Sequence, residues 1–285
     1  MLLRPLTFLL AAFFALVLPA RAQLAPDDTP SETGVVVPNF WDPRARLERP
    51  SVAEIGVIRF LTTDDFPPFA FRDRRGILIG FDIDLARAVC AVLGVQCAMQ
   101  ARPFETLVDG LKDDTGNAII AGFDAERARA ADLTATQAYL KIPGRFVTAK
   151  ESTFSPGPPA PKGFVGVVCG TAHAAYLARY FPDLNVACYS ELSVPIAELR
   201  AGRLTAIFGD ALSLSFWLHG PESEDCCRFS GGAYIDDRYF GAGLAIVVKG
   251  EDRTLKFALD YALREVYRSG AYEELYLRYF PVSLF

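Results

Sequence analysis

The stretch between residues 58 and 101 constrains the fold more than any other part of this chain. Ile58, Phe60 and Thr62 occupy alternate positions, which is the period of a β-strand. The pair Pro67-Pro68 ends that strand, because proline cannot donate a hydrogen bond to a neighbouring strand. The phenylalanines on either side of the pair are expected to form an exposed aromatic loop.

A helix is predicted after this loop. Residues 72–76 are polar and end in glycine, which predicts a turn before a short strand at 77–81. Over 82–93 apolar side chains recur at spacings of three and four, which is typical of an α-helix, and Gly94 predicts its C-terminal cap. A second long strand is expected at 96–101.

Strands and helices continue to alternate through the rest of the chain. This alternation predicts largely parallel sheets with right-handed crossovers. The segment 152–162 contains four prolines and marks a boundary between two such units. The further strands are expected at 117–122, 145–149, 165–169, 186–189 and 204–208, and the further helices at 104–111, 193–201, 211–218, 254–268 and 272–279.

Composition excludes some classes of function. Hydrophobic residues make up 51% of the 285 residues, which is ample for a core. The formal net charge is −5 and no basic tract occurs, so a nucleic-acid-binding surface is not expected.

The first 22 residues have the pattern of an export signal. Arg4 supplies the positive charge, residues 8–17 supply the apolar segment, and Ala20-Arg21-Ala22 fits the small-x-small cleavage rule. We therefore expect the mature chain to begin at Gln23 and to be periplasmic. An uncleaved membrane anchor is the alternative, but the apolar run is short for a membrane span.

Residues 23–53 are rich in proline, aspartate, threonine and arginine, which predicts an extended arm. Phe40 and Trp41 stand out within it. We expect them to anchor the arm to the body of the protein, and the alternative is that they bind a partner protein.

Several motifs together resemble one protein family. The sequence Gly-Phe-Asp-Ile-Asp-Leu at 80–85, preceded by Pro68-Phe69, is the most specific of them. The Glu-Arg and Asp-Leu pairs within 126–133 and the glycine-rich run 239–246 add to it, and Tyr279-Phe280 stands near the end. Over residues 55–281 the chain resembles the family 3 solute-binding proteins, the periplasmic amino-acid receptors of ABC transporters.

This resemblance implies an α/β fold of the type II periplasmic binding proteins. Such a protein has two lobes, each a mostly parallel sheet flanked by helices, with the ligand cleft between them. The implied domains are the signal peptide at 1–22, the arm at 23–53, lobe 1 at 54–146, lobe 2 at 147–235 and a return to lobe 1 at 236–285. In the motif at 80–85, Phe81 and Leu85 are interpreted as core residues that identify the fold and not the ligand.

The resemblance also implies residues that bind the charged ends of an amino acid. Arg127 occupies the family position that binds the ligand carboxylate, and arginine offers a planar pair of donors suited to it. Asp210 occupies the position that binds the ammonium group, although it is equally suited to cap the helix that follows. Thr171 starts a helix whose free N–H groups can meet a carboxylate. Phe66 and Phe104 match family positions beside the ligand, with ordinary core packing as the alternative.

Two departures from the family pattern lie in this expected site. Thr63 stands where many members have an acidic residue, with Asp64 and Asp65 next to it. The segment 121–125, which contains the expected site residue Gly122, is shorter than usual and lacks the usual hydroxyls. The site is therefore expected to be less polar than in a typical receptor, which leaves its amino-acid specificity open.

The six cysteines fit an oxidising compartment. The resemblance implies a Cys90–Cys97 disulfide, because some basic amino-acid receptors have one at this separation. Cys169 and Cys188 lie in strands expected to be neighbours, so a bridge between them is possible. The adjacent pair Cys226-Cys227 is not assigned. A metal site is not expected, since no Cys-x-x-Cys pair occurs and the chain has only two histidines.

The resulting hypothesis is a monomeric, non-catalytic periplasmic receptor without a cofactor. It would close on an amino acid or a related small carboxylate and deliver it to an ABC transporter permease. One alternative is an accessory module that binds a partner protein through Phe40 and Trp41. The other is an enzyme like cyclohexadienyl dehydratase on the same fold, using a carboxylate such as Asp124, Glu126 or Asp210.

Overall fold

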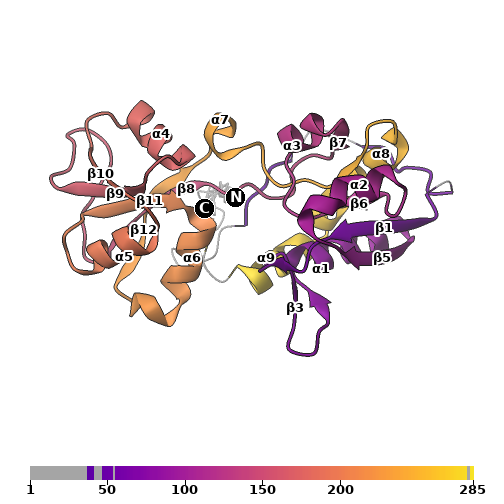
Figure 1. The fold of residues 1–285 in the computed structure, drawn as a ribbon, viewed down its shortest axis with the longest axis horizontal. Coiled ribbons are helices and arrows are strands. Elements are labelled where there is room, and N and C mark those ends of the chain that lie inside the picture. The colour runs from indigo at the N-terminus through magenta and orange to yellow at the C-terminus, as the bar shows by residue number, and fades with distance from the viewer. Residues whose placement is uncertain (1–36, 42–46, 54, 281–282) are drawn as a thin grey trace, which may run out of the picture. The chain divides into compact units, whose positions relative to one another are not determined.

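The computed structural model describes residues 37–41, 47–53, 55–280 and 283–285, so the predicted export signal lies outside the described residues. The described chain forms two five-stranded sheets, each flanked by helices, and we call each sheet with its helices a lobe (Figure 1). The expected two-lobed α/β fold is confirmed.

Lobe 1 contains the stretch that dominates the sequence. Its sheet has the strand order β5-β1-β6-β13-β7. The strands are β1 (Val57–Thr62), β5 (Gln96–Ala101), β6 (Ala118–Ile119), β7 (Leu133–Ala135) and β13 (Val247–Lys249). The helices are α1 (Phe81–Leu93), the 3₁₀ turn η1 (Phe104–Thr106), α2 (Leu107–Lys112), α3 (Ala125–Ala130), α8 (Arg253–Arg268) and α9 (Ala271–Tyr279).

Lobe 2 repeats this architecture with the strand order β10-β9-β11-β8-β12. The strands are β8 (Gly144–Ala149), β9 (Phe164–Val168), β10 (Asn185–Tyr189), β11 (Ala206–Asp210) and β12 (Cys227–Tyr234). The helices are α4 (Ala172–Tyr180), α5 (Ser193–Arg200), α6 (Ala211–His219), the 3₁₀ turn η2 (Pro221–Ser223) and α7 (Asp237–Phe240).

One strand in each sheet runs against the others. In lobe 1, β1 is parallel to β5 and β6, whereas β13 is antiparallel to both of its neighbours. In lobe 2, β8 is the antiparallel strand. These are the two strands that the chain enters through the connecting segments 136–143 and 241–246. The segments pair with each other, because Leu244 N–H donates to Leu140 O at 2.7 Å and Tyr139 N–H donates to Leu244 O at 2.8 Å.

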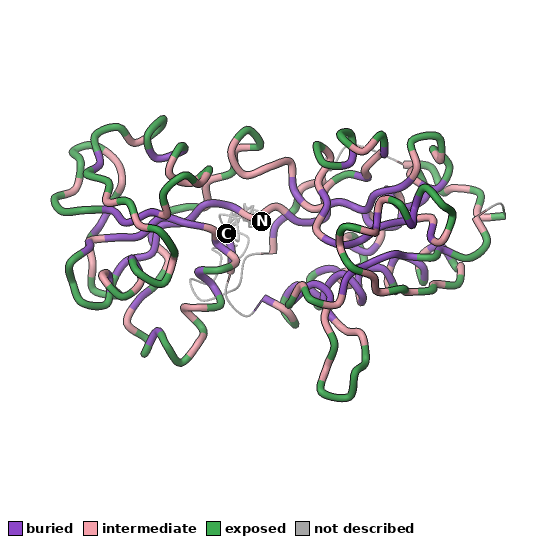
Figure 2. Tube along the Cα trace, in the orientation of Figure 1, coloured by how far each residue is buried: buried purple, intermediate pink, exposed green. Residues whose placement is uncertain are grey.

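The cores follow the two-residue period of the strands. Ile58 and Phe60 of β1 face a cluster formed with α1, α8 and α9, whereas Leu61 faces a cluster formed with α2 and α3. In lobe 2, Phe146 and Val147 face opposite sides of the sheet in the same way. Figure 2 shows the resulting pattern, with largely buried strands between more exposed helices and loops.

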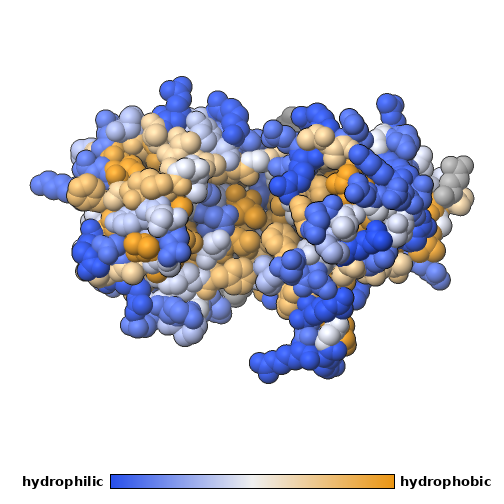
Figure 3. Space-filling view, viewed as in Figure 1, coloured by the Kyte–Doolittle hydropathy of each residue, from blue (hydrophilic) through white to orange (hydrophobic). Residues whose placement is uncertain are grey.

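The aromatic loop after β1 differs from the sequence expectation. It forms a small sheet of β2 (Asp65–Phe66), β3 (Ala70–Arg72) and β4 (Leu78–Ile79), and the β3–β4 hairpin projects from the lobe with a largely hydrophilic tip (Figures 1 and 3). The expectation that all the phenylalanines here are exposed is wrong for Phe69, which is fully buried. Its ring packs against Phe81 and Phe280, so the hairpin is anchored in the core of lobe 1.

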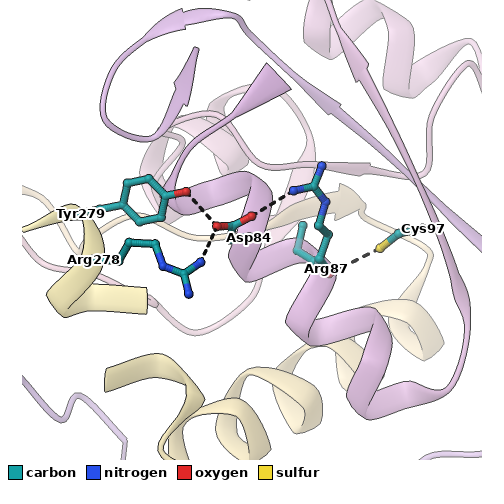
Figure 4. Close-up of polar contacts among 6 residues, drawn as sticks. Asp84, Arg87, Cys97, Arg278 and Tyr279 are labelled. Atoms are coloured by element: carbon teal, nitrogen blue, oxygen red, sulfur yellow. Dashed lines mark hydrogen bonds and ion pairs between the residues drawn. The ribbon is translucent and has the colours of Figure 1, made fainter. Parts of the chain in front are cut away.

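The Gly-Phe-Asp-Ile-Asp-Leu motif forms the start of α1 and serves the fold. Phe81 and Leu85 are fully buried, as expected. Asp84 accepts hydrogen bonds from Tyr279 Oη at 2.7 Å and Arg278 Nη1 at 3.1 Å, and it also pairs with Arg87 (Figure 4). This carboxylate therefore ties α1 to the C-terminal helix α9.

The described part of the arm packs against the body of the protein, as expected. The Phe40 ring lies 5.6 Å from that of Phe285, and Trp41 packs against the core cluster of lobe 1. Phe40 and Trp41 are therefore engaged in contacts within the protein, and they are the two side chains through which the alternative hypothesis has the arm bind a partner protein.

All six cysteines form disulfides. The Cys90–Cys97 bridge links the end of α1 to β5, with Cα atoms 6.0 Å apart. Cys169 and Cys188 are also bridged, which the parallel pairing of β9 and β10 makes possible. The remaining bridge joins the adjacent residues Cys226 and Cys227.

Candidate functional site

A pocket of about 330 Å³ opens at one edge of the lobe 1 sheet. Three parallel strands, β5, β1 and β6, end at this edge, and the pocket is built from the segments that follow them. Ligands of open α/β sheets collect outside the carboxyl ends of strands. We call it the aromatic pocket, and it is lined by Thr63, Asp65, Phe66, Phe104, Ala121, Gly122 and Arg127.

Arg127 is the cation of the aromatic pocket. It lies on α3, whose N-terminus is capped by Asp124: the Asp124 carboxylate accepts the Arg127 backbone N–H at 2.8 Å. The guanidinium lies over the rings of Phe104 and Phe123, at 5.2 and 5.8 Å from their centroids. Within the described part of the chain it has no hydrogen-bond or carboxylate partner, so its donors are available to a ligand.

Phe66 forms a wall of the pocket and depends on a glycine. Its ring stacks on the buried Phe69 at 4.7 Å. A Cβ atom on Gly122 would lie 2.9 Å from the Phe66 ring, and Gly122 has a positive φ of 76°. Glycine at 122 therefore supplies both a backbone conformation and the space that this aromatic wall needs.

Thr63 and Asp65 form the polar end of the pocket. Thr63 is almost completely buried, and its hydroxyl donates a hydrogen bond to Asp65 Oδ1. Asp65 is exposed, and no described residue donates a hydrogen bond to its Oδ2. Thr63 thus orients a carboxylate that has one oxygen available.

A second hollow of about 450 Å³ adjoins the aromatic pocket and shares Gly122 and Arg127 with it. We call it the acidic hollow. Its further lining residues are Asp124, Glu126 and Ala130. The single arginine therefore lies between an aromatic surface and two carboxylate side chains.

Asp210 and Thr171 occupy the corresponding edge of the lobe 2 sheet. Asp210 ends β11 and caps α6, accepting the Ser213 N–H at 2.7 Å. Thr171 follows β9 and caps α4, accepting the Ala174 N–H at 3.3 Å. His173 lies close to Asp210 and stacks on Phe240 at 4.9 Å; burial lowers the pKa of His173, and the nearby Asp210 opposes that shift.

The structure thus brings five of the seven expected ligand residues into one pocket in lobe 1 and places the other two in lobe 2. Sequence reasoning missed Asp65 as a lining residue. The sequence does contain a signal for it. Thr63 stands where many family members have an acidic residue, and Asp65 supplies a carboxylate two positions later. Among the described residues, no cluster of potential metal ligands occurs, and no helix has the length and apolar character needed to cross a membrane.

Comparison with known proteins identifies the family. The profile of the bacterial extracellular solute-binding proteins, family 3, matches residues 58–282. The chain belongs to this family. The match covers the whole aromatic pocket and both sheets except Val57, the first residue of β1.

Relatives of this family 3 protein include two binding proteins for basic amino acids. The arginine-binding periplasmic protein of Mannheimia haemolytica is 29% identical over 211 residues, which is 74% of this chain and 86% of the relative. The histidine-binding periplasmic protein of Salmonella typhimurium is 30% identical over 232 residues, or 80% and 89% of the two chains.

A solved structure supports the fold of this family 3 protein. The L-cystine solute receptor of Neisseria gonorrhoeae, in its unliganded open conformation, superimposes with a TM-score of 0.70 at 17% identity. The comparison covers 82% of this chain and 96% of the receptor. At this level of identity the likeness concerns the fold alone.

Proposed function

We propose that this protein is a periplasmic receptor that binds an amino acid and delivers it to an ABC transporter permease. The observation that carries the proposal is the guanidinium of Arg127, which has no carboxylate partner among the described residues and lies over two aromatic rings in a pocket at the carboxyl ends of three strands. A carboxylate is the ligand group that such a guanidinium fits best. The binding of amino acids by the relatives, according to their names, supports the same class of ligand.

In this proposal the two lobes share the charged ends of the ligand. Arg127 of lobe 1 binds the carboxylate, and Asp210 of lobe 2 binds the ammonium group. Phe66 and Phe104 cover the side chain, while Thr63 and Gly122 shape the pocket around it. The N–H groups at the start of α4, next to Thr171, add donors when lobe 2 closes over the ligand.

The first test is a thermal-shift screen of amino acids, small carboxylates and prephenate against the purified protein. A ligand at about 100 times its Kd stabilises the folded state by about 2.7 kcal/mol. The stabilisation should disappear in Arg127→Ala and persist in Arg129→Ala. Arg129 is a matched control, because it is an exposed arginine on the same helix that does not line the pocket. Equal loss in both variants would contradict the carboxylate role of Arg127.

Asp210 needs a substitution that separates its two roles. Asparagine caps helices about as well as aspartate but carries no charge. Asp210→Asn should therefore keep the stability of the free protein and weaken amino-acid binding at least tenfold. A loss of stability with unchanged affinity would leave Asp210 as a helix cap alone.

Location and catalysis are tested separately. Export predicts recovery of the protein in the periplasmic fraction with Gln23 at its N-terminus, whereas a chain lacking residues 1–22 should stay in the cytoplasm. The enzyme alternative predicts conversion of prephenate into phenylpyruvate, carbon dioxide and water. Our proposal expects no phenylpyruvate above a protein-free control.

A further inference from the structure

The aromatic pocket and the acidic hollow have an imbalance of charge. Three carboxylates, those of Asp65, Asp124 and Glu126, line these two spaces, together with the one guanidinium of Arg127. The formal excess is two negative charges. Asp210 of lobe 2, as the partner of the ligand ammonium in the proposed function, adds a further carboxylate.

A neutral amino acid leaves this imbalance in place. Its carboxylate pairs with Arg127 and its ammonium group with one aspartate, which leaves the other carboxylates without a counter-charge. An anionic ligand would add repulsion, because placing a further negative charge beside these carboxylates disfavours binding. Only a ligand with an additional positive charge reduces the excess.

Asp65 is the carboxylate best placed to meet that charge. It lines the same pocket as Arg127 and the rings of Phe66 and Phe104, whereas Asp124 and Glu126 line the adjoining hollow. One oxygen of Asp124 is already used to cap α3. The buried Thr63 hydroxyl fixes Asp65 Oδ1, and no described residue donates to Oδ2. A cation between these groups also gains from the faces of the aromatic rings.

We propose that Asp65, oriented by Thr63, selects ligands with a cationic side chain, so that the solute is a basic amino acid. This inference rests on the proposed function for the Arg127 site and adds a residue that decides which amino acid is bound. Thr63 is a positioning residue in it, since its hydroxyl acts on the ligand only through the Asp65 carboxylate.

The test compares L-arginine with L-citrulline by isothermal titration calorimetry. Citrulline has nearly the shape of arginine, but its side chain is neutral. The protein should bind arginine at least tenfold more tightly than citrulline. In Asp65→Asn the ratio of the arginine affinity to the citrulline affinity should fall to about three or less, while the citrulline affinity changes little. Thr63→Val should lower the ratio to an intermediate value, because the carboxylate remains but loses its orienting donor.

Asp64→Asn is the matched control. It removes the same charge from the neighbouring position, but Asp64 pairs with Arg72 on the hairpin and does not line the pocket. Its arginine-to-citrulline ratio should equal that of the unmodified protein. An equal fall in Asp64→Asn would mean that net charge alone sets the preference and would overturn the role of Asp65.

Other outcomes separate this inference from the proposed function. If a neutral amino acid binds as tightly as arginine, and binding still requires Arg127, the charge selection is wrong and the receptor function stands. If the ratio persists in Asp65→Asn, Asp65 is not the selecting residue. If no amino acid binds, both proposals fail.

Discussion

The phenolic hydroxyl of Tyr139 donates a hydrogen bond of 2.8 Å to Asp82 Oδ1 inside lobe 1. Asp82 belongs to the motif at the start of α1 and is completely buried, while Tyr139 belongs to the connecting segment between the lobes. The backbone carbonyl of Tyr139 also accepts a hydrogen bond from Tyr272 of α9 at 2.7 Å. The connecting segment is therefore held on lobe 1 by a buried polar group and two helices.

Asp82 should make stability depend on pH. Burial raises its pKa to about 7, and the Tyr139 hydrogen bond opposes this shift. Between pH 4 and pH 7 the folded protein keeps a proton that the unfolded chain has lost, so stability falls as pH rises. The expected loss is about 4 kcal/mol across this range, at about 1.4 kcal/mol per pH unit. Urea unfolding at several pH values should show this loss in the free energy of unfolding. If Asp82 is not the group responsible, the free energies of unfolding of the protein and of Asp82→Asn will differ by the same amount at every pH.

Tyr139→Phe should destabilise the protein by about 1–3 kcal/mol, because it leaves the buried carboxyl of Asp82 without its partner. The hydrogen bond lowers the pKa of Asp82. Removing it should therefore raise that pKa and extend the loss of stability to higher pH. Tyr279→Phe is a useful comparison, because it removes a phenol from the less buried Asp84 and should cost less. A larger cost for Tyr279→Phe would contradict the argument from burial.

Gly122→Ala should disturb the aromatic pocket. The substitution strains a positive φ and places a methyl group against Phe66, so both stability and ligand affinity should fall. Gly202→Ala is the control, because Gly202 has a similar φ of 72° but open space around its Cβ position. We expect Gly202→Ala to cost about 1–2 kcal/mol from the backbone alone and to leave affinity unchanged. Gly122→Ala should cost more in thermal or urea unfolding.

The Cys90–Cys97 and Cys169–Cys188 disulfides should contribute different amounts to the free energy of unfolding. By loop length, removal of the Cys90–Cys97 bridge should cost about 2.5 kcal/mol and removal of the Cys169–Cys188 bridge about 3.3 kcal/mol. Paired alanine variants, Cys90→Ala with Cys97→Ala and Cys169→Ala with Cys188→Ala, allow urea unfolding to compare them. If neither pair changes the unfolding midpoint, the bridges do not constrain the unfolded chain as this model of loop entropy requires.

Most elements of the fold could be predicted from local patterns. The alternation at 58–62, the helical spacing at 82–93 and the cap at Gly94 each depend on a few neighbouring residues, and each is present in the structure. The three-residue strand β7 and the eight-residue strand β12 are not among the strands predicted from the sequence, because their pairing partners β13 and β8 lie far away in sequence. Tyr239 and Phe240, which begin the glycine-rich run of the family pattern, fall in the short helix α7, which is not among the predicted helices.

The candidate site was only partly predictable. The resemblance pointed to Arg127, Phe66 and Phe104, but it did not assign Asp65 to the site, because the acidic position of the family corresponds to Thr63. Phe69 shows the converse error, since proline neighbours suggested a loop and the ring is in the core. In both cases the residue's neighbours come from segments that are distant along the chain, and the spacing of apolar residues in the sequence does not reveal which segments meet.

The sequence by itself indicated the order of most strands and helices, the start of a helix at Thr171, a helix cap as one of two roles for Asp210, and membership of a family with two lobes. These properties depend on residue period and on side chains that reach their own backbone. Only the tertiary structure decided that Asp82 is a buried carboxyl and that Asp65 and Arg127 share one pocket. The reason is that burial and charge pairing arise where strand ends meet, and parallel strands bring together segments that are distant along the chain.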